Sequence, residues 1–456
     1  MSTAIDRAID LRQLAHDVVS RATRAGATQA EVIVREGDEF STVVRLGAVE
    51  TLKESGSRGM GLRVFIGQRT ASTYTSDFSD DGIEKLVSNA VSLARVSSED
   101  PFAGLPQRDE FGQLTQDLDL YYDDVYSLPT AERIEYAKRA EAAALEVDSR
   151  LTNSDGASFD AATGRKVLTN SLGFVGEYRR SYCSVSAVPI AQDTNGAMQR
   201  DWWFSSARTL KKLDSPESVG REAARRTLRR LGARKIATTQ VPVVFDPIVA
   251  RSIIEHIFEG ANGDAIYRGS SFFASKLGEQ IANTNVTVVD DGTMVGGFGS
   301  SPFDGEGVPT RRTVVVDKGV LKSYLLNTYT ARKLNMQTTG NASRGLAGNP
   351  GIGAGNFYLE NGTESPADII KNVGRGLYVT EFLGFGVNMT TGDYSRGASG
   401  LWIENGELTY PVEEITVAGN LKEMFKNIVA TGNDLEFRSS VAAPTIRIDG
   451  LTVAGA

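Results

Sequence analysis

The chain has 456 residues, enough for two or three domains with sizeable cores, and its 41% hydrophobic and 23% charged residues are ordinary for a globular protein. A single cysteine, Cys183, excludes an intrachain disulfide, and two histidines, His16 and His256, leave few ways to build a zinc site or a catalytic triad. A net charge of −8 argues against a nucleic-acid-binding polycation.

The first hundred residues predict a compact α+β unit. Helical periodicity spans 4–24 and ends at Gly26, and a second apolar helical face spans 81–97. Between them, alternating runs predict short strands at 30–36, 40–46, 49–55, 61–66 and 69–74, divided at Gly37–Asp38 and Gly47, with a hairpin turn at Gly67–Gln68.

The middle of the chain changes character twice. Residues 99–127 contain prolines and many acids and predict a linker or long loop, followed by a helix over 130–147. Residues 151–210 predict β structure with turns at 153–156, 162–164, 171–173 and 193–196. Ser215–Pro216 begins another helix, whose broad basic face comprises Arg221, Arg225, Arg226, Arg229 and Arg230. Such a face could contact phosphates, but a solvated face, or one meeting an acidic patch of the same or a partner chain, is favoured.

From Gln240 onward the sequence is rich in glycine and strand-forming residues. A strand at 241–245 leads to a helix that Asp246–Pro247 begins and that ends near Glu259. The predicted class is therefore α+β, with an N-terminal unit of helices on an antiparallel-rich sheet and a β-rich C-terminal domain with few helices. The predicted regions are 1–110, 111–235 and 236–456.

A glycine-rich segment over 291–307 is the first candidate site. It lacks the GxxxxGK[ST] phosphate cradle, and no helix with a downstream ribose-binding acid follows it. Long loops without regular structure are commonly functional. We therefore expect an interface or a loop that borders substrate, with Gly296, Gly297 and Phe298 as contact residues.

The segment 388–408 is the second candidate. It predicts a polar loop over 388–399, a strand over 400–404, an Asn405–Gly406 hairpin turn and a second strand. Strands of this kind can accept an extended peptide along an edge, although the pattern taken alone favours an ordinary hairpin.

The helix that starts at Asp246 carries the third candidate. Glu255, His256 and Glu259 lie within one turn of each other, as in a metal-binding helix. The set is incomplete, because the other histidine lies on the first predicted helix. A helix-end histidine that is hydrogen-bonded near an interface is the simpler interpretation.

Together these segments resemble the TldD/PmbA family, and the PmbA (TldE) branch more closely. The resemblance rests on Glu259-Gly-Ala-Asn-Gly-Asp with the residues that follow to Phe273, on the loop 283–307, and on Gly392-Asp-Tyr-Ser-Arg-Gly-Ala-Ser-Gly-Leu-Trp. It extends over essentially the whole chain.

The resemblance implies a metalloprotease assembled from a TldD and a TldE subunit. In TldD, a helix with the pattern His-Glu-x-x-x-His supplies two metal ligands and a catalytic glutamate, and a cysteine near the C-terminus completes the site. Aligned with that helix, this chain has Arg251 and Ser252 at the positions of the first histidine and the glutamate, and His256 at the second histidine. Serines replace the cysteine, so we expect no zinc bound by this chain and no catalytic residue in it.

The leading hypothesis is thus a non-catalytic TldE-type subunit of a cytoplasmic heteromeric metalloprotease. The partner would hold the zinc, and the assembly would enclose a cavity that admits unfolded or short peptides, held as added strands. Neither nucleic acid nor membrane is expected as a partner, because the chain is acidic and lacks a signal peptide and a long apolar run. Two alternatives stay open: a homodimeric peptide-binding scaffold, and an independent hydrolase with a metal on His256.

The residues expected to matter fall into two groups. The remnant of the family helix comprises Arg251, Ser252, His256 and Glu259. The substrate or partner contacts comprise Gly296, Gly297, Phe298, Asp393, Tyr394, Ser395, Arg396 and Ser399.

Overall fold

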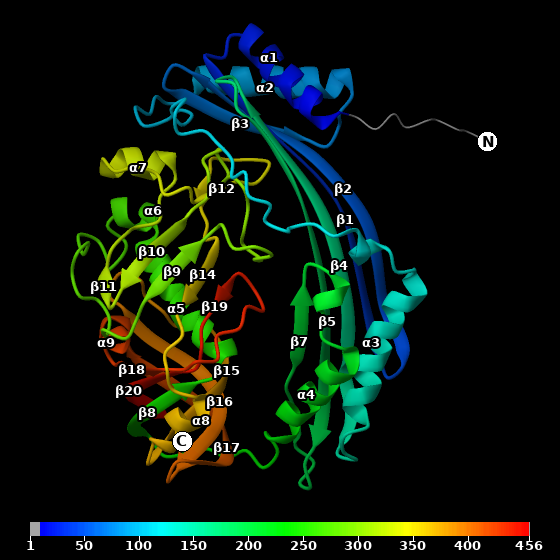
Figure 1. Ribbon diagram of the computed structural model, residues 1–456, viewed down its shortest axis with the longest axis vertical. Helices are drawn as coiled ribbons and strands as arrows, with labels where there is room; N and C mark the ends of the chain where they lie inside the picture. The colour runs from blue at the N-terminus through cyan, green and yellow to red at the C-terminus, as the bar shows by residue number, and fades with distance from the viewer. Residues whose placement is uncertain (1–9, 456) are drawn as a thin grey trace.

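A curved seven-stranded sheet built by the first half of the chain holds the β-rich second half against its concave side (Figure 1). The computed structural model describes residues 10–455. All neighbouring strands of this sheet are antiparallel. In sheet order they are β3 (Arg69–Thr75), β2 (Ala48–Ile66), β1 (Gln29–Arg45), β4 (Leu151–Asn170), β5 (Val175–Gln192) and β6 (Met198–Arg200), with β7 (Trp203–Ala207) also paired to β5. The sheet takes strands from both of the first two predicted regions, 1–110 and 111–235.

The strands are longer than the sequence pattern predicts. The predicted division at Gly37–Asp38 is wrong, because β1 runs through it, and the predicted turns at 153–156 and 162–164 are wrong because β4 runs through both. Gly37 lies opposite Gly164, and a Cβ on Gly37 would lie 2.4 Å from the Thr163 carbonyl oxygen, so this glycine permits close strand approach and not a turn. At 153–156 the register shifts in a bulge. The turns at Gly47, 67–68, 171–173 and 193–196 are confirmed.

Four helices cover the convex face of the sheet. The pair α1 (Leu11–Arg24) and α2 (Asp80–Val96) packs on one end of the sheet, and α3 (Thr130–Leu145) and α4 (Pro216–Leu228) pack on the other (Figure 1). These are the predicted helices, although the predicted start of the first at residue 4 lies outside the described residues. The two helix pairs leave the middle of the convex face uncovered.

Residues 97–129 form an irregular segment, as predicted, apart from the short 3₁₀ helix η1 (Asp123–Tyr126). It is tied to the C-terminal half by backbone hydrogen bonds from Gly112 to Gly307 (3.0 Å) and from Leu114 to Pro302 (2.9 Å). It therefore joins the two halves as a packed strap.

The C-terminal half contains two sheets and a small hairpin-like pair. The larger sheet has the order β17 (Glu407–Asn420), β16 (Asp393–Glu404), β15 (Arg375–Leu383), β8 (Thr239–Phe245), β20 (Ile446–Ala454) and β18 (Ile428–Thr431), and β17 also pairs with β20, which closes a ring. The second comprises β11 (Val320–Leu321), β10 (Arg312–Asp317), β9 (Val288–Asp291), β14 (Asn356–Leu359) and β19 (Val441–Ala442), and the pair is β12 (Ala342–Ser343) with β13 (Gly351–Ile352).

Short helices complete this half. They are α5 (Pro247–Ala261), α6 (Gly263–Tyr267), α7 (Thr328–Leu334), α8 (Pro366–Lys371) and α9 (Leu421–Lys426); one further 3₁₀ turn, η2 (Leu210–Lys212), lies in the first half. A single large core joins α5 to strands of both C-terminal sheets. The α+β class with a β-rich C-terminal half is confirmed.

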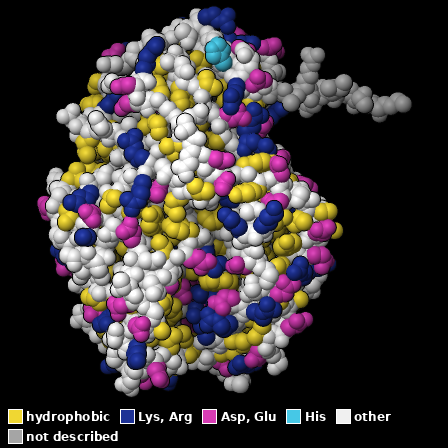
Figure 2. Space-filling model, in the orientation of Figure 1, with side chains coloured by type: hydrophobic (Ala, Val, Ile, Leu, Met, Phe, Trp, Pro, Cys, Tyr) yellow, Lys and Arg dark blue, Asp and Glu magenta, His cyan; other side chains and the backbone are white. Residues whose placement is uncertain are grey.

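The arginine-rich face of α4 meets acids of the same chain, as one of the sequence alternatives predicts. The Arg230 guanidinium lies 2.7 Å from the Glu381 carboxylate, and the buried Arg226 lies 3.4 Å from Asp246. Basic and acidic side chains are interspersed on the face seen in Figure 2. No helix within residues 10–455 is long and apolar enough to cross a membrane.

Candidate functional site

Helix α5 positions the residues that the family pattern singles out. Asp246 caps its N-terminus by accepting a hydrogen bond from the Ile248 N–H (3.1 Å), and Pro247 occupies the first turn. One apolar stripe of the helix is fully buried in the C-terminal core. The packing therefore fixes the orientation of the remaining face, which carries His256 and Glu259.

His256 lies in an open groove of about 530 Å³ beside α5, which Glu259, Arg396 and Phe385 also line. Its Nδ1 lies 2.8 Å from Glu259 Oε2, and its ring meets the edge of Tyr394 at a centroid distance of 6.0 Å. With Nδ1 as the donor to Glu259, Nε2 carries a lone pair, and it has no hydrogen-bond partner within residues 10–455. The hydrogen-bonded helix-end histidine is confirmed.

The positions of the missing catalytic groups are occupied by side chains with other partners. Arg251 donates to Ser439 Oγ (3.3 Å), and Ser252 donates to the Val249 carbonyl oxygen (2.8 Å) while accepting from Arg396 (3.4 Å). Burial lowers the pKa of Arg251 from its usual value, and the charge of Glu255 opposes that shift. A guanidinium cannot ligate a metal, and this hydroxyl is no general base.

The ligand set of the groove does not fit zinc. A catalytic zinc needs three protein ligands from histidine, cysteine or carboxylate side chains. No group of three such side chains is placed to hold a metal ion in the part of the chain that the structure describes. Cys183 is buried on the convex side of the large sheet under α3, where burial raises its pKa to about 12. Neither cysteine chemistry nor a histidine pair is therefore available at α5.

Strand β16 brings part of the second candidate segment to the same groove. The prediction of a loop over 388–399 is wrong from Asp393 onward, since β16 begins there; Gly400 permits close contact with β15, where a Cβ would lie 2.1 Å from the Tyr378 carbonyl oxygen. The Asn405–Gly406 turn is confirmed, with φ of 53° and 80°.

The predicted contact residues of β16 point to different places. Tyr394 is buried against His256, and burial raises its pKa. Arg396 lies over the Phe382 ring and donates to the Gly384 carbonyl oxygen (3.2 Å). Asp393 is exposed, and hydrogen bonds from Thr391 and Asn420 lower its pKa. Ser395 is also exposed, whereas Ser399 is buried.

The glycine-rich loop does not join this groove by any hydrogen bond to α5 within residues 10–455. Instead Arg208, at the end of β7, donates to the carbonyl oxygens of Gly297 (2.7 Å) and Phe298 (2.9 Å), and the Phe298 ring meets Tyr182 of β5. Gly296 donates its N–H to the Leu118 carbonyl oxygen (2.7 Å). The loop thus packs between the two halves of the chain, and its predicted contact with substrate or a partner stays a prediction.

The apolar rim of the groove was not predicted from the sequence. Phe385 is 103% exposed, and Val387 and Met389 line the groove beside it. The available signal was the apolar run Phe382-Leu-Gly-Phe-Gly-Val, which follows a strand and is interrupted by glycines. An exposed phenylalanine beside other apolar side chains of a groove is consistent with a contact surface.

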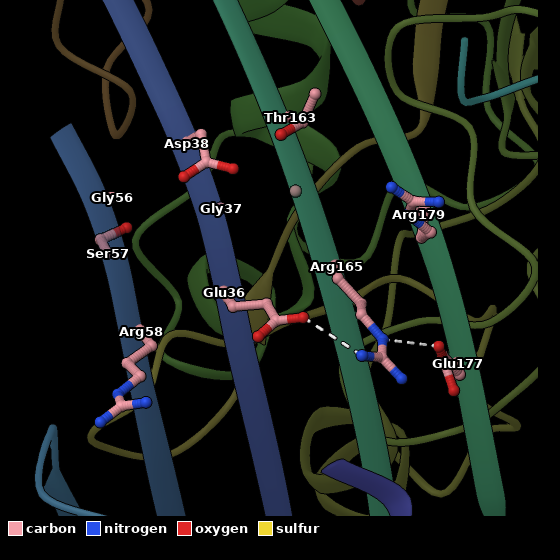
Figure 3. Close-up of a pocket in the computed structure, with 11 residues that line it drawn as sticks. Glu36, Gly37, Asp38, Gly56, Ser57, Arg58, Thr163, Arg165, Glu177 and Arg179 are labelled. Carbon is pink, nitrogen blue, oxygen red and sulfur yellow. Dashed lines mark hydrogen bonds and ion pairs between the residues drawn. The ribbon is translucent and has the colours of Figure 1, made fainter. Parts of the chain in front are cut away.

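A second hollow lies on the convex face of the large sheet, between the two helix pairs (Figure 3). It holds about 880 Å³ and is lined by charged side chains of β1, β2, β4 and β5. In Figure 3, Arg165 lies between Glu36 (3.2 Å) and Glu177 (2.7 Å). Arg179 and Arg58, also on its walls, lie against the rings of Tyr121 and Phe78. Each arginine of this hollow has a partner in the chain.

Comparisons with known protein families match nearly the whole chain. The profile described as the PmbA/TldA metallopeptidase C-terminal domain matches residues 238–455. The central-domain profile of the same family matches residues 123–231, and the profile of domain 1 matches residues 30–94.

Curated relatives and a solved structure agree with these profiles. The chain is 38% identical to the metalloprotease PmbA of Escherichia coli O157:H7 over 447 residues, which is 97% of each chain. It is 37% identical to a PmbA homolog of Haemophilus influenzae, covering 100% of this chain and 98% of that one. The crystal structure of TldE from Thermococcus kodakarensis has the same fold, with a TM-score of 0.86, 19% identity, and coverage of 97% of this chain and 100% of that one.

Proposed function

Because the chain belongs to the PmbA/TldD metallopeptidase family, we propose that it is the non-catalytic, TldE-type subunit of a peptidase whose zinc site lies in a TldD-type partner. The observation that carries this proposal is the state of α5. The helix is kept, with His256 hydrogen-bonded at its end, but Arg251 and Ser252 occupy the ligand and base positions and are engaged elsewhere.

In this account the chain binds peptide and partner, and the partner performs the hydrolysis. The groove at α5 offers polar side chains and an apolar rim at Phe385, Val387 and Met389, which suits a protein contact. Residues 48–59 of β2 pair with β1 but not with β3, which begins its pairing at Met60. No strand within residues 10–455 pairs with that edge, which supports binding of unfolded peptides as an added strand, where backbone hydrogen bonds give affinity without strict sequence choice.

The test is assembly with a TldD-type subunit that carries an intact His-Glu-x-x-x-His helix. We expect the two chains to co-purify and to hydrolyse an unfolded peptide together. Phe385→Asp should weaken assembly at least tenfold, because it places a charge in the apolar rim. Val96→Asp is the matched control, since Val96 is 80% exposed on α2, away from the groove.

Three results would count against the proposal. If the wild-type chain forms a homodimer that excludes the partner, the scaffold alternative replaces it. If the isolated chain hydrolyses peptides, the non-catalytic role is wrong. If Phe385→Asp assembles as well as Val96→Asp does, the α5 groove is not the contact with the partner.

A further inference from the structure

A small cavity of about 170 Å³ lies between the concave face of the large sheet and the C-terminal half. Strands β1, β4 and β5 supply its sheet side, and glycine-rich segments at 292–305, 340–344 and 353–355 supply the opposite side. Its lining includes five cationic side chains: Arg35, Lys166, Arg180, Arg311 and Arg344. The cavity is separate from both the α5 groove and the hollow of Figure 3.

The strand register places two of these cations, Arg35 and Lys166, on directly opposite positions of neighbouring strands. Arg35 of β1 lies directly opposite Lys166 of β4, which in turn lies opposite Tyr178 of β5. Like charges directly opposite each other destabilise a sheet. Within residues 10–455 neither cation forms an ion pair, and the Lys166 Nζ has a single long hydrogen bond, to the Asp304 carbonyl oxygen (3.4 Å).

Several donors around the cavity lack acceptors. Arg344 is 3% exposed, and although its guanidinium lies 2.7 Å from the Glu31 carboxylate, none of its side-chain N–H groups is directed at an acceptor among the described residues. Glu31 also pairs with Arg63 (2.5 Å), which a second buried acid, Glu306, contacts at 3.4 Å. Arg35 Nε is buried and likewise lacks a partner. Buried donors without acceptors are rare and point to a missing ligand or water.

The acids of the cavity do not offset its cations. Asp290 accepts hydrogen bonds from the Gly355 N–H (2.7 Å) and Asn341 (2.6 Å), and Asp304 accepts from three backbone N–H groups. Burial raises the pKa of each to about 7, so both are partly neutral near neutral pH. The pKa of Tyr178 is raised by burial but lowered more strongly by Lys166, Arg180, Arg35 and Arg208, as expected in a positive field.

We propose that this cavity binds a small oxyanion, either the terminal carboxylate of a peptide or free inorganic phosphate. A carboxylate or phosphate supplies acceptors for the guanidinium N–H groups that lack partners, and its negative charge offsets the repulsion between Arg35 and Lys166. A cavity of this volume holds a group of benzene size, which suits one terminal residue or one phosphate and excludes a nucleotide. The exposed Arg180 at the cavity wall offers a first electrostatic contact. The proposal does not depend on partnership with a TldD-type subunit.

Calorimetric titration of the full chain tests the proposal with three probes: inorganic phosphate, N-acetyl-Gly-Ala with a free carboxylate, and the amide of that dipeptide. We expect saturable one-site binding of phosphate, of the free acid, or of both, and no binding of the amide. Binding of the acid alone identifies a peptide end as the ligand, and binding of phosphate alone identifies the free ion.

Matched variants locate the site. Lys166→Met should weaken binding at least tenfold, whereas Arg165→Met, its neighbour on the opposite face of β4, should leave binding unchanged. Arg180→Gln, at an exposed position that folding tolerates, should weaken binding about threefold and covers the case in which Lys166→Met does not fold. The proposal is overturned if neither anion binds, if the amide binds as well as the acid, or if Lys166→Met or Arg180→Gln binds as the wild type does.

Discussion

The two faces of the large sheet carry neighbouring rows of charged residues, which differ in whether the charges form ion pairs. On the convex face, Arg165 lies opposite Arg179 in the strand register, but it also forms ion pairs with Glu36 and Glu177, which offset its charge (Figure 3). One residue along, on the concave face, Arg35 and Lys166 lie opposite each other without an ion pair in the described chain. The same strands thus produce one balanced row, in which Arg165 is paired with acids, and one unbalanced row, in which neither cation has an ion pair in the described chain.

A charge that is paired within the chain supports the fold, whereas an unpaired charge points to a role in binding. A balanced surface row gains modest Coulomb energy and needs nothing from outside the chain. An unbalanced row that is half-buried, like Arg35 and Lys166, loses stability unless a ligand supplies the missing charge. In the α5 groove, His256 pairs with Glu259, whereas Arg251 and Arg396 donate to neutral oxygens, and the exposed feature of the groove is its apolar rim.

The largest contrast that we expect is in thiol reactivity. Cys183 is buried under α3 on the convex side of the sheet, and burial raises its pKa to about 12. The neighbouring Tyr182 is 37% exposed on the concave side. At pH 8 the native thiol of Cys183 should react with dithionitrobenzoate roughly 1,000-fold more slowly than the thiol of Tyr182→Cys in a Cys183→Ala background. Equal rates would show that the convex core opens as readily as the concave face.

The contributions of two acids to stability should depend on pH with opposite signs: Asp290, which lines the small cavity, and Glu177, on the convex face of the sheet. Burial raises the pKa of Asp290 to about 7 from 3.8, so its contribution is complete below about pH 4 and is lost as the pH rises through 7. Asp290→Asn should remove this loss, which amounts to at most about 4 kcal/mol.

Glu177, on the convex face, provides the matched case. Burial acts to raise its pKa, but the combined effect of Arg165 and Arg12 is larger, so the pKa of Glu177 is lowered overall. Its stabilising contribution is therefore present above its usual pKa and is lost as the pH falls. Glu177→Gln should therefore lower stability at pH 7 more than at pH 4. Urea unfolding at both pH values measures both effects, and changes of the same sign in the two variants would contradict this account.

Two glycines of β2 should respond differently to alanine. A Cβ on Gly61, on the concave face, would lie 1.8 Å from the Leu346 carbonyl oxygen, which belongs to the C-terminal half. Gly61→Ala should therefore lower the free energy of unfolding by about 1–3 kcal/mol. A Cβ on Gly56, on the convex face, meets only the rotatable Asp38 carboxylate at 3.2 Å. Gly56→Ala should change stability by no more than about 0.5 kcal/mol in chemical denaturation, and equal losses would contradict close packing at Gly61.

The smallest expected effect concerns the adjacent cations of β4. Without added anion, Lys166→Met should leave the free energy of unfolding unchanged or raise it by up to about 1 kcal/mol, because it removes a like-charge contact. Arg165→Met should lower it by up to about 1 kcal/mol, because it breaks two partly exposed ion pairs. Denaturation in phosphate-free buffer compares them, and a clear loss of stability in Lys166→Met would mean that Lys166 has a structural partner.

Local chemistry made the helix starts and one hairpin predictable. Ser215–Pro216 and Asp246–Pro247 begin helices because each pairs an N-cap side chain with a proline suited to the first turn, and Asn405–Gly406 takes the positive φ values that a two-residue turn requires. Glycines misled the strand predictions, since Gly37 permits strand contact where a turn was expected.

The basic cavity lay beyond sequence reasoning because no local pattern contains it. Arg35, Lys166 and Tyr178 are far apart in sequence and meet only through the register of three long strands. The contact between α5 and β16 is equally non-local, although the family resemblance singled out both segments. At α5 the sequence alone was sufficient, because it shows Arg251 and Ser252 at the positions where the family pattern has a metal ligand and the catalytic glutamate.

The most direct test of the central claim is the zinc content and peptidase activity of the purified chain, alone and with a TldD-type subunit. We predict less than about 0.1 zinc per isolated chain and no hydrolysis, because α5 offers His256 and Glu259 but the described residues supply no third ligand beside them. We also predict hydrolysis with zinc in the partner once the two are combined. One tightly held zinc per isolated chain, together with peptide hydrolysis, would contradict the account.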